Sequence, residues 1–190
     1  MGRGAAAIAI SFPLVILAAW PVQAASPLAA GAVEVAPVLL AQTSVEQAAL
    51  QRQRAALLYN QGNLAGTAAL LEPALAAYLA GSDPNQVQQT ASFLALVYAE
   101  LGDAAVDNGN LTVALAYYRQ QIDALAVGFN RAAEVEALTN AAQVALQLGQ
   151  TALAQEYLKT GMSVAQEVGN QALIQQIQDL LNTQINRPVF

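Results

Sequence analysis

The chain has 190 residues, of which 56% are hydrophobic but only 6% aromatic, and alanine alone accounts for 43 of them. With no cysteine and no histidine, the sequence excludes disulfide scaffolds, cysteine nucleophiles, serine–histidine arrangements and histidine or thiolate metal sites. Thirteen acidic against seven basic residues give a net charge of −6, so we expect no nucleic-acid partner. The small average side chain favours an all-α protein of thin, closely packed helices over one thick core.

The amino terminus has the pattern of an export signal. The first four residues carry one positive charge, at Arg3, and residues 5–20 are almost wholly apolar. Short side chains up to Ala24 offer a cleavage site, so we expect 1–24 to be a signal peptide. The alternative is an uncleaved membrane anchor, but the apolar run is shorter than the ~20 residues that span a bilayer, and Pro13 interrupts it. We therefore expect an exported protein with no stable membrane span after cleavage, located in the periplasm or secreted, or in a thylakoid lumen if the host has one.

The rest of the chain divides into three parts. Residues 25–43 contain two prolines and a glycine and show no sustained helical period, which predicts a flexible linker. Residues 44–186 consist of helix-length stretches separated by short clusters of Gly, Asn, Asp and Pro, which predicts one helical repeat domain. Residues 187–190 are interpreted as a tail.

Seven helices are predicted within the repeat domain. Ser44 and Gln47 form a capping box that would open the first helix. Asp83 and Pro84 are typical of an N-cap followed by the first helical position. The predicted helices are 44–60, 64–80, 84–107, 111–126, 131–148, 151–167 and 171–185.

Three of the predicted turns are alike, which indicates a repeated helical hairpin. Gly62, Gly109 and Gly149 occupy these turns, at spacings of 47 and 40 residues. A glycine there supplies the positive φ with which many helices end, and the chain can reverse within a few residues.

The middle unit carries a more specific pattern of bulky and small side chains. These are Tyr98, Leu101, Gly102, Ala105, Gly109, Ala114 and Tyr118. The pattern resembles the tetratricopeptide repeat (TPR), although Ala105 stands where that family usually has a tyrosine. Gly102 and Ala114 are small enough for two helices to approach closely, and Tyr98 and Tyr118 would fill the space beside them. The other two units match less completely, with Gly62 in the first and Gly149 and Ala154 in the third.

The resemblance implies a right-handed α-solenoid of three TPR-like helical hairpins plus a C-terminal capping helix. In that family the first helix of each hairpin lines a concave groove that binds a peptide or a helix of another protein. Carried over by register, the groove positions of this chain are Arg52, Tyr59, Asn60, Asp103, Asp107, Glu136, Gln143 and Gln147. Their amide and carboxylate groups favour a polar or basic peptide.

Other functions fit the sequence less well. Glu100, Asp103 and Asp107 share a helical stripe, but a straight stripe supplies only one side of a cation cage, which favours a solvated face and no metal site. An enzyme would need carboxylates paired across a cleft, and the sequence predicts none. The prediction is a non-catalytic adaptor, scaffold or assembly factor that needs no cofactor. A small-ligand or metal-binding module is the alternative, and self-association through the alanine-rich faces stays open.

Overall fold

The structure, a computed structural model, describes residues 35–185, and in this range the chain is all-α, without strands. The predicted signal peptide, the first part of the predicted linker and the tail lie outside the described residues. Over the described part the all-α prediction is confirmed. The helices are α1 (Val35–Asn60), α2 (Leu64–Ala80), α3 (Pro84–Asp107), α4 (Leu111–Val127), α5 (Arg131–Gln147), α6 (Thr151–Glu167), α7 (Gln171–Leu180) and a terminal π-helical turn, η1 (Leu181–Ile185).

The first helix begins earlier than predicted. It starts at Val35, so residues 35–43 of the predicted linker are helical and Ser44 lies inside α1. Pro37, one of the two prolines on which the linker prediction rests, lies in the first turn of α1. The backbone N–H groups of a first turn have no partner within the helix, so a proline there removes no helical hydrogen bond. Leu39, Leu40, Ala41 and Gln42 follow soon after and are good helix formers, which favours a helix through this segment.

Six turns of one geometry connect the seven α-helices of residues 35–185. In each turn the middle residue has a positive φ, and the next N–H donates to a carbonyl five residues earlier, as Gln150 does to Ala145 at 2.8 Å. This is the Schellman arrangement, which pairs carbonyls that a helix end would otherwise leave unpaired. The predicted turn glycines Gly62, Gly109 and Gly149 all occupy the middle position, with φ of 72–75°.

The turns recur at nearly constant intervals. The positive-φ residues are spaced 20, 27, 20, 20 and 20 residues apart along the chain. The single longer interval arises because α3 has 24 residues, whereas α2, α4, α5 and α6 have 17 each. Seven extra residues make almost two turns of helix, so the added length leaves each face of α3 in the same orientation.

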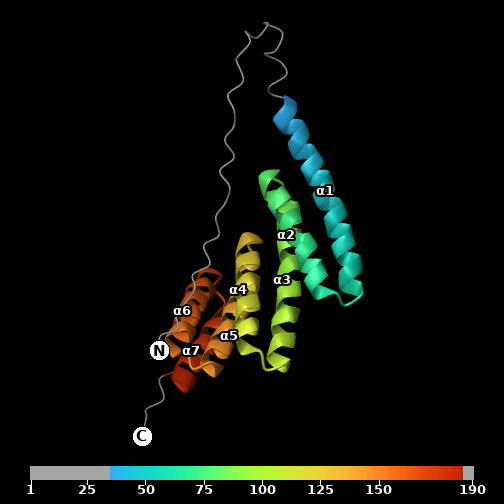
Figure 1. Ribbon diagram of the computed structural model, residues 1–190. Helices are drawn as coiled ribbons and strands as arrows, with labels where there is room; N and C mark the ends of the chain where they lie inside the picture. Colours follow the sequence, from blue (N-terminus) through green and yellow to red (C-terminus); the bar gives the residue numbers. More distant parts are fainter. Residues whose placement is uncertain (1–34, 186–190) are drawn as a thin grey trace, which may run out of the picture.

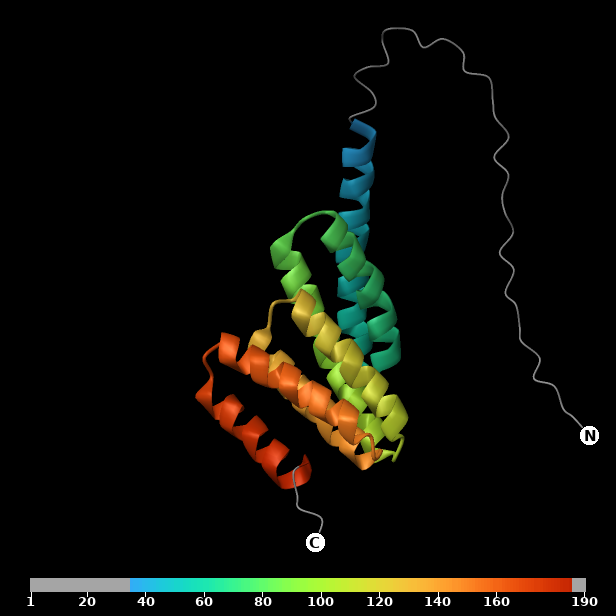
Figure 2. The same cartoon turned by 90° about the vertical axis from the view of Figure 1, so that its left-hand side faces the viewer.

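Each helix packs mainly on its neighbours in sequence, from α1 at one end of the molecule to α7 at the other (Figures 1 and 2). Alternate helices also touch. Arg52 of α1 donates to Gln89 of α3 at 3.2 Å, and Arg119 of α4 donates to Tyr157 of α6 at 2.6 Å. Ala137 of α5 belongs to the same apolar cluster as the buried residues of α2 and α3.

Small side chains allow this close packing. A Cβ built on Gly102 would lie only 2.7 Å from the ring of Tyr118, so the glycine permits α3 and α4 to approach, as predicted. Ala114 and Ala154 are fully buried, and Tyr98 and Tyr118 are almost so. Leu101 packs against the core as a partly buried residue.

Candidate interaction surface

The exposed face of α5 is a polar stripe. Glu136, Asn140, Gln143 and Gln147 are all exposed and follow one another at intervals of four, three and four residues. This spacing places them on one side of the helix. Three of them, Glu136, Gln143 and Gln147, were predicted as groove positions, and the structure brings them together.

A second stripe runs along α3. Gln89, Leu96, Asp103 and Asp107 are exposed and lie on one helical face, at intervals of seven, seven and four residues. Leu96 is 47% exposed and was not among the predicted site residues. It shares its face with Asp103 one heptad further on, and this spacing is the signal that could have identified it. We refer to these residues of α3 and α5 together as the polar stripes.

Arg52 does not stand free on the surface of α1. Its guanidinium donates to the side-chain amides of Gln86 and Gln89 on α3, and it lies 5.7 Å from the ring centre of Tyr78. A cation over an aromatic face is an attractive contact. Arg52 therefore joins α1, α2 and α3, which leaves it less available to a partner than the sequence predicted.

Tyr59 also connects α1 to α3. Its hydroxyl donates to Glu100, and its ring meets Phe93 edge to face at a centroid distance of 5.4 Å. The hydrogen bond to Glu100 raises the pKa of Tyr59, with smaller contributions from burial and from the charge of Glu100. Asn60, the last residue of α1, is exposed and lies outside the polar stripes.

Two of the three acidic residues of α3 accept hydrogen bonds from tyrosine hydroxyls. Tyr118 donates to Asp103 at 2.6 Å, while Glu100 accepts from Tyr59. Burial, followed by this hydrogen bond and by the charges of Asp103 and Asp107, raises the pKa of Tyr118. Within residues 35–185 no three acidic side chains gather closely enough to hold a metal ion.

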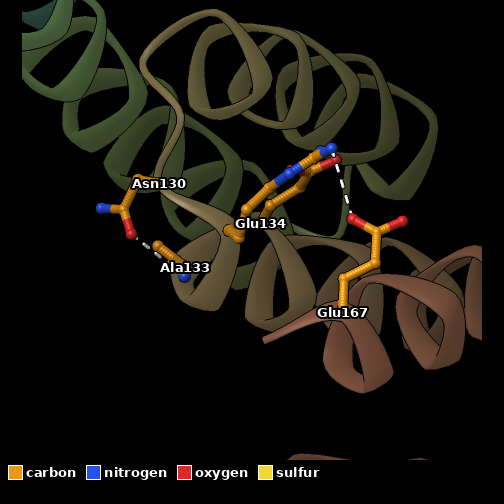
Figure 3. A network of polar contacts seen from close by, with 5 residues as sticks. Asn130, Ala133, Glu134 and Glu167 are labelled. Carbon is orange, nitrogen blue, oxygen red and sulfur yellow. Dashed lines mark hydrogen bonds and ion pairs between the residues drawn. The ribbon is translucent and has the colours of Figure 1, made fainter. Parts of the chain in front are cut away.

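A charged network joins the start of α5 to the end of α6. Arg131 donates to the nearly buried carboxylate of Glu134 at 2.8 Å and lies 3.5 Å from Glu167 (Figure 3). In the same turn Asn130 accepts from the backbone N–H of Ala133 at 3.4 Å, which caps α5. Glu134 lies in the first turn, where the helix dipole favours a negative charge.

Comparison with family models and with curated proteins identifies no relative of this chain. A scan against protein-family models finds no match, and a search of curated proteins finds none either. Among the helices of the described residues, none is both long and apolar enough to cross a membrane.

Proposed function

We propose that the seven helices form a right-handed solenoid of three TPR-like hairpins, α1–α2, α3–α4 and α5–α6, with α7 as the capping helix. Six equivalent turns at nearly constant intervals and the contacts between alternate helices support this arrangement. The close approach of Gly102 to Tyr118 supports the TPR pattern at its most specific pair. Repeat lengths of 40 and 47 residues, taken between Gly62, Gly109 and Gly149, exceed the 34 of the common TPR.

The function we propose for this fold is non-catalytic binding of a protein partner, as an adaptor, scaffold or assembly factor. The polar stripe of α5 is the observation that carries the proposal. Glu136, Gln143 and Gln147 are exposed, while the residues that alternate with them, such as Ala137 and Val144, are completely or almost completely buried. The packing of α5 therefore does not require these polar residues, and they are available for recognition.

The chemistry of the polar stripes defines the partner. Amide side chains both donate and accept hydrogen bonds, so they can pair with the backbone of an extended peptide or with polar side chains of a helix. Glu136, Asp103 and Asp107 favour a segment that carries lysine or arginine. Leu96 adds an exposed apolar side chain on the same helical face as Asp103. The partner we propose is a polar or basic segment of another protein.

We place this binding outside the cytoplasm, on the strength of the apolar amino-terminal segment that ends near Ala24. The compartment would be the periplasm, the medium or a thylakoid lumen. Intact-mass measurement of the exported protein should find a chain that starts at Ala25. Recovery of the full-length chain in the membrane fraction would contradict the proposal of cleavage.

Site-specific photo-cross-linking in cells tests the binding surface. A photoreactive benzoylphenylalanine replaces Gln143 or Leu96 on the polar stripes, or the exposed Glu156 of α6 as a control. We expect an adduct of one discrete mass from positions 143 and 96 and none from 156. Equal yields at all three positions would contradict the assignment. An adduct of two copies of this chain would indicate self-association and would contradict the proposal that the stripes bind another protein.

A further inference from the structure

The turn between α4 and α5 holds a residue that does not suit its backbone. Phe129 has a φ of 54°, in the left-handed region that bulky side chains rarely adopt. Of the six turns, four have glycine at this position and one has Ser82. Phe129 is also 82% exposed, the largest exposure among the big apolar side chains of residues 44–183.

The turn itself does not need this phenylalanine. Its hydrogen bonds, from Phe129 to Ala126 at 3.2 Å and from Asn130 to Leu125 at 3.0 Å, match those that the Gly149 turn makes. A glycine would make the same bonds without strain, and an exposed ring adds little to the core. A strained, exposed aromatic residue in a turn that would form without it points to a role in binding.

Phe129 is one of the residues that line a hollow on the surface. The hollow has a volume of about 380 Å³ and is lined by Leu79, Ser82, Pro84, Val87, Gln88 and Phe129, together with Asp83 and Asn85. Leu79 is half exposed, so it adds apolar surface to the same lining. The turn is held against α3, because a Cβ built on Gly128 would lie 3.2 Å from the Cβ of Ala91. The hollow lies between the α2–α3 turn and the α4–α5 turn, and none of the residues that line it belongs to the polar stripes.

The charge that lines the hollow is negative. Asp83 is the charged residue among those that line it. Arg131 follows Phe129 closely in sequence, but Glu134 and Glu167 hold its guanidinium (Figure 3). Two carboxylates thus accompany one cation, and the chain as a whole carries −6. A partner with positive charge complements this region.

We propose that this hollow is a second docking site, which takes an exposed peptide segment of a protein partner. The segment carries a bulky aliphatic or aromatic side chain flanked by lysine or arginine. The apolar side chain packs between Phe129 and Leu79, and the flanking cation lies near Asp83. Aromatic anchors in apolar hollows supply a large share of the affinity in protein interfaces, with charges around them that guide association.

Two blocked synthetic peptides probe the site, one with the core Lys-Leu-Phe-Lys and the other with Glu-Leu-Phe-Glu. Each is titrated into the full mature chain and followed by amide chemical shifts in nuclear magnetic resonance. We expect the basic peptide to bind at least tenfold more tightly than the acidic one. The amides that shift should be those of Leu79, Asp83, Gln88 and Phe129.

Two variants separate the contributions of the ring and the charge. Phe129→Gly introduces the residue that most of the turns carry. This variant should lower the affinity for the basic peptide at least tenfold while the protein stays folded. Asp83→Asn keeps an N-cap on α3, because asparagine caps a helix as well as aspartate does. This variant should lower the affinity for the same peptide about threefold. No binding of the basic peptide, or unchanged affinity in Phe129→Gly, would overturn the proposal. Shifts confined to α3 and α5 around Leu96 and Gln143 would also overturn it, while they would support the polar stripes.

Discussion

The two faces of α5 differ in both size and chemistry. One face consists mainly of buried alanine, valine and leucine, among which Ala137, Ala141 and Ala145 have no exposed surface at all. The other consists of exposed amides and a carboxylate, at Glu136, Gln143 and Gln147. Side chains on the first face determine how closely helices approach, whereas those on the second can change without disturbing a neighbour. The difference separates stability from recognition within a single helix.

The largest effect should come from the buried face. Leu138 is 3% exposed and lies against Gly161 of α6, so Leu138→Ala leaves a cavity. We expect a loss of about 2–5 kcal/mol in the free energy of unfolding, measured by urea denaturation. Gln143→Ala on the opposite face is the matched control and should change stability by less than about 0.5 kcal/mol. Comparable losses in the two variants would break the comparison.

An added methyl group at Gly102 should have the next largest effect. Alanine is the better helix former, yet its Cβ would meet the ring of Tyr118 at 2.7 Å. We expect Gly102→Ala to lower the free energy of unfolding by about 1–3 kcal/mol, because the clash outweighs the helix preference. The same change in a Tyr118→Leu background should cost less. A cost that is independent of residue 118 would show that the pair is not in contact.

Alkaline pH should destabilise the protein through its buried tyrosines. Burial, and then hydrogen bonds to Glu72 and Asp103, raise the pKa values of Tyr98 and Tyr118 above the usual value of about 10. The unfolded chain loses these protons first, so the stabilisation is complete below pH ~10 and declines as the pH rises further, by up to about 1.4 kcal/mol per pH unit for each tyrosine. Urea denaturation between pH 9 and 11 measures the slope. A profile that stays flat above pH 10 would contradict the burial of these hydroxyls.

Removing a glycine from one turn and introducing a glycine into another should change the free energy of unfolding in opposite directions. A left-handed conformation costs a residue with a side chain about 1–2 kcal/mol, and glycine loses about 0.5–1 kcal/mol of that advantage through its freedom in the unfolded state. Gly149→Ala should therefore lose about 1 kcal/mol in the free energy of unfolding. Phe129→Gly should lose nothing and gain up to about 1 kcal/mol. A clear loss in Phe129→Gly would show that the ring stabilises the fold.

The helices could be predicted closely from the sequence because their ends carry local signals. Gly, Asn, Asp and Pro mark every turn, and Asp83 caps α3 by accepting from Asn85 and Gln86 at 3.1 Å. The start of α1 was predicted wrongly because of Pro37. A proline is compatible with a helix only in the first turn, and the sequence does not show that the helix begins at Val35, two residues before it. Ser44 and Gln47 have the sequence pattern of a capping box, but both lie inside α1 and not at its start.

The candidate site was harder to predict than the fold. Register along a helix gives the face of a residue, which is why Glu136, Gln143 and Gln147 fall on one stripe. It does not give the side chains of the neighbouring helix, which hold Arg52 and Tyr59 through Gln86, Gln89 and Glu100. Phe129 was missed because it lies in a turn, although an alignment of the six turns would have placed it at a glycine position.

Charge reversal on the exposed face of α5 tests the central claim most directly. Affinity for the partner recovered by cross-linking would be measured calorimetrically for the unaltered chain, for Glu136→Lys with Gln143→Lys, and for Glu156→Lys on the exposed side of α6. We predict that the first variant binds at least tenfold more weakly, that the second binds within twofold of the unaltered chain, and that all three unfold alike. Equal affinities for all three proteins would contradict recognition through the polar stripes.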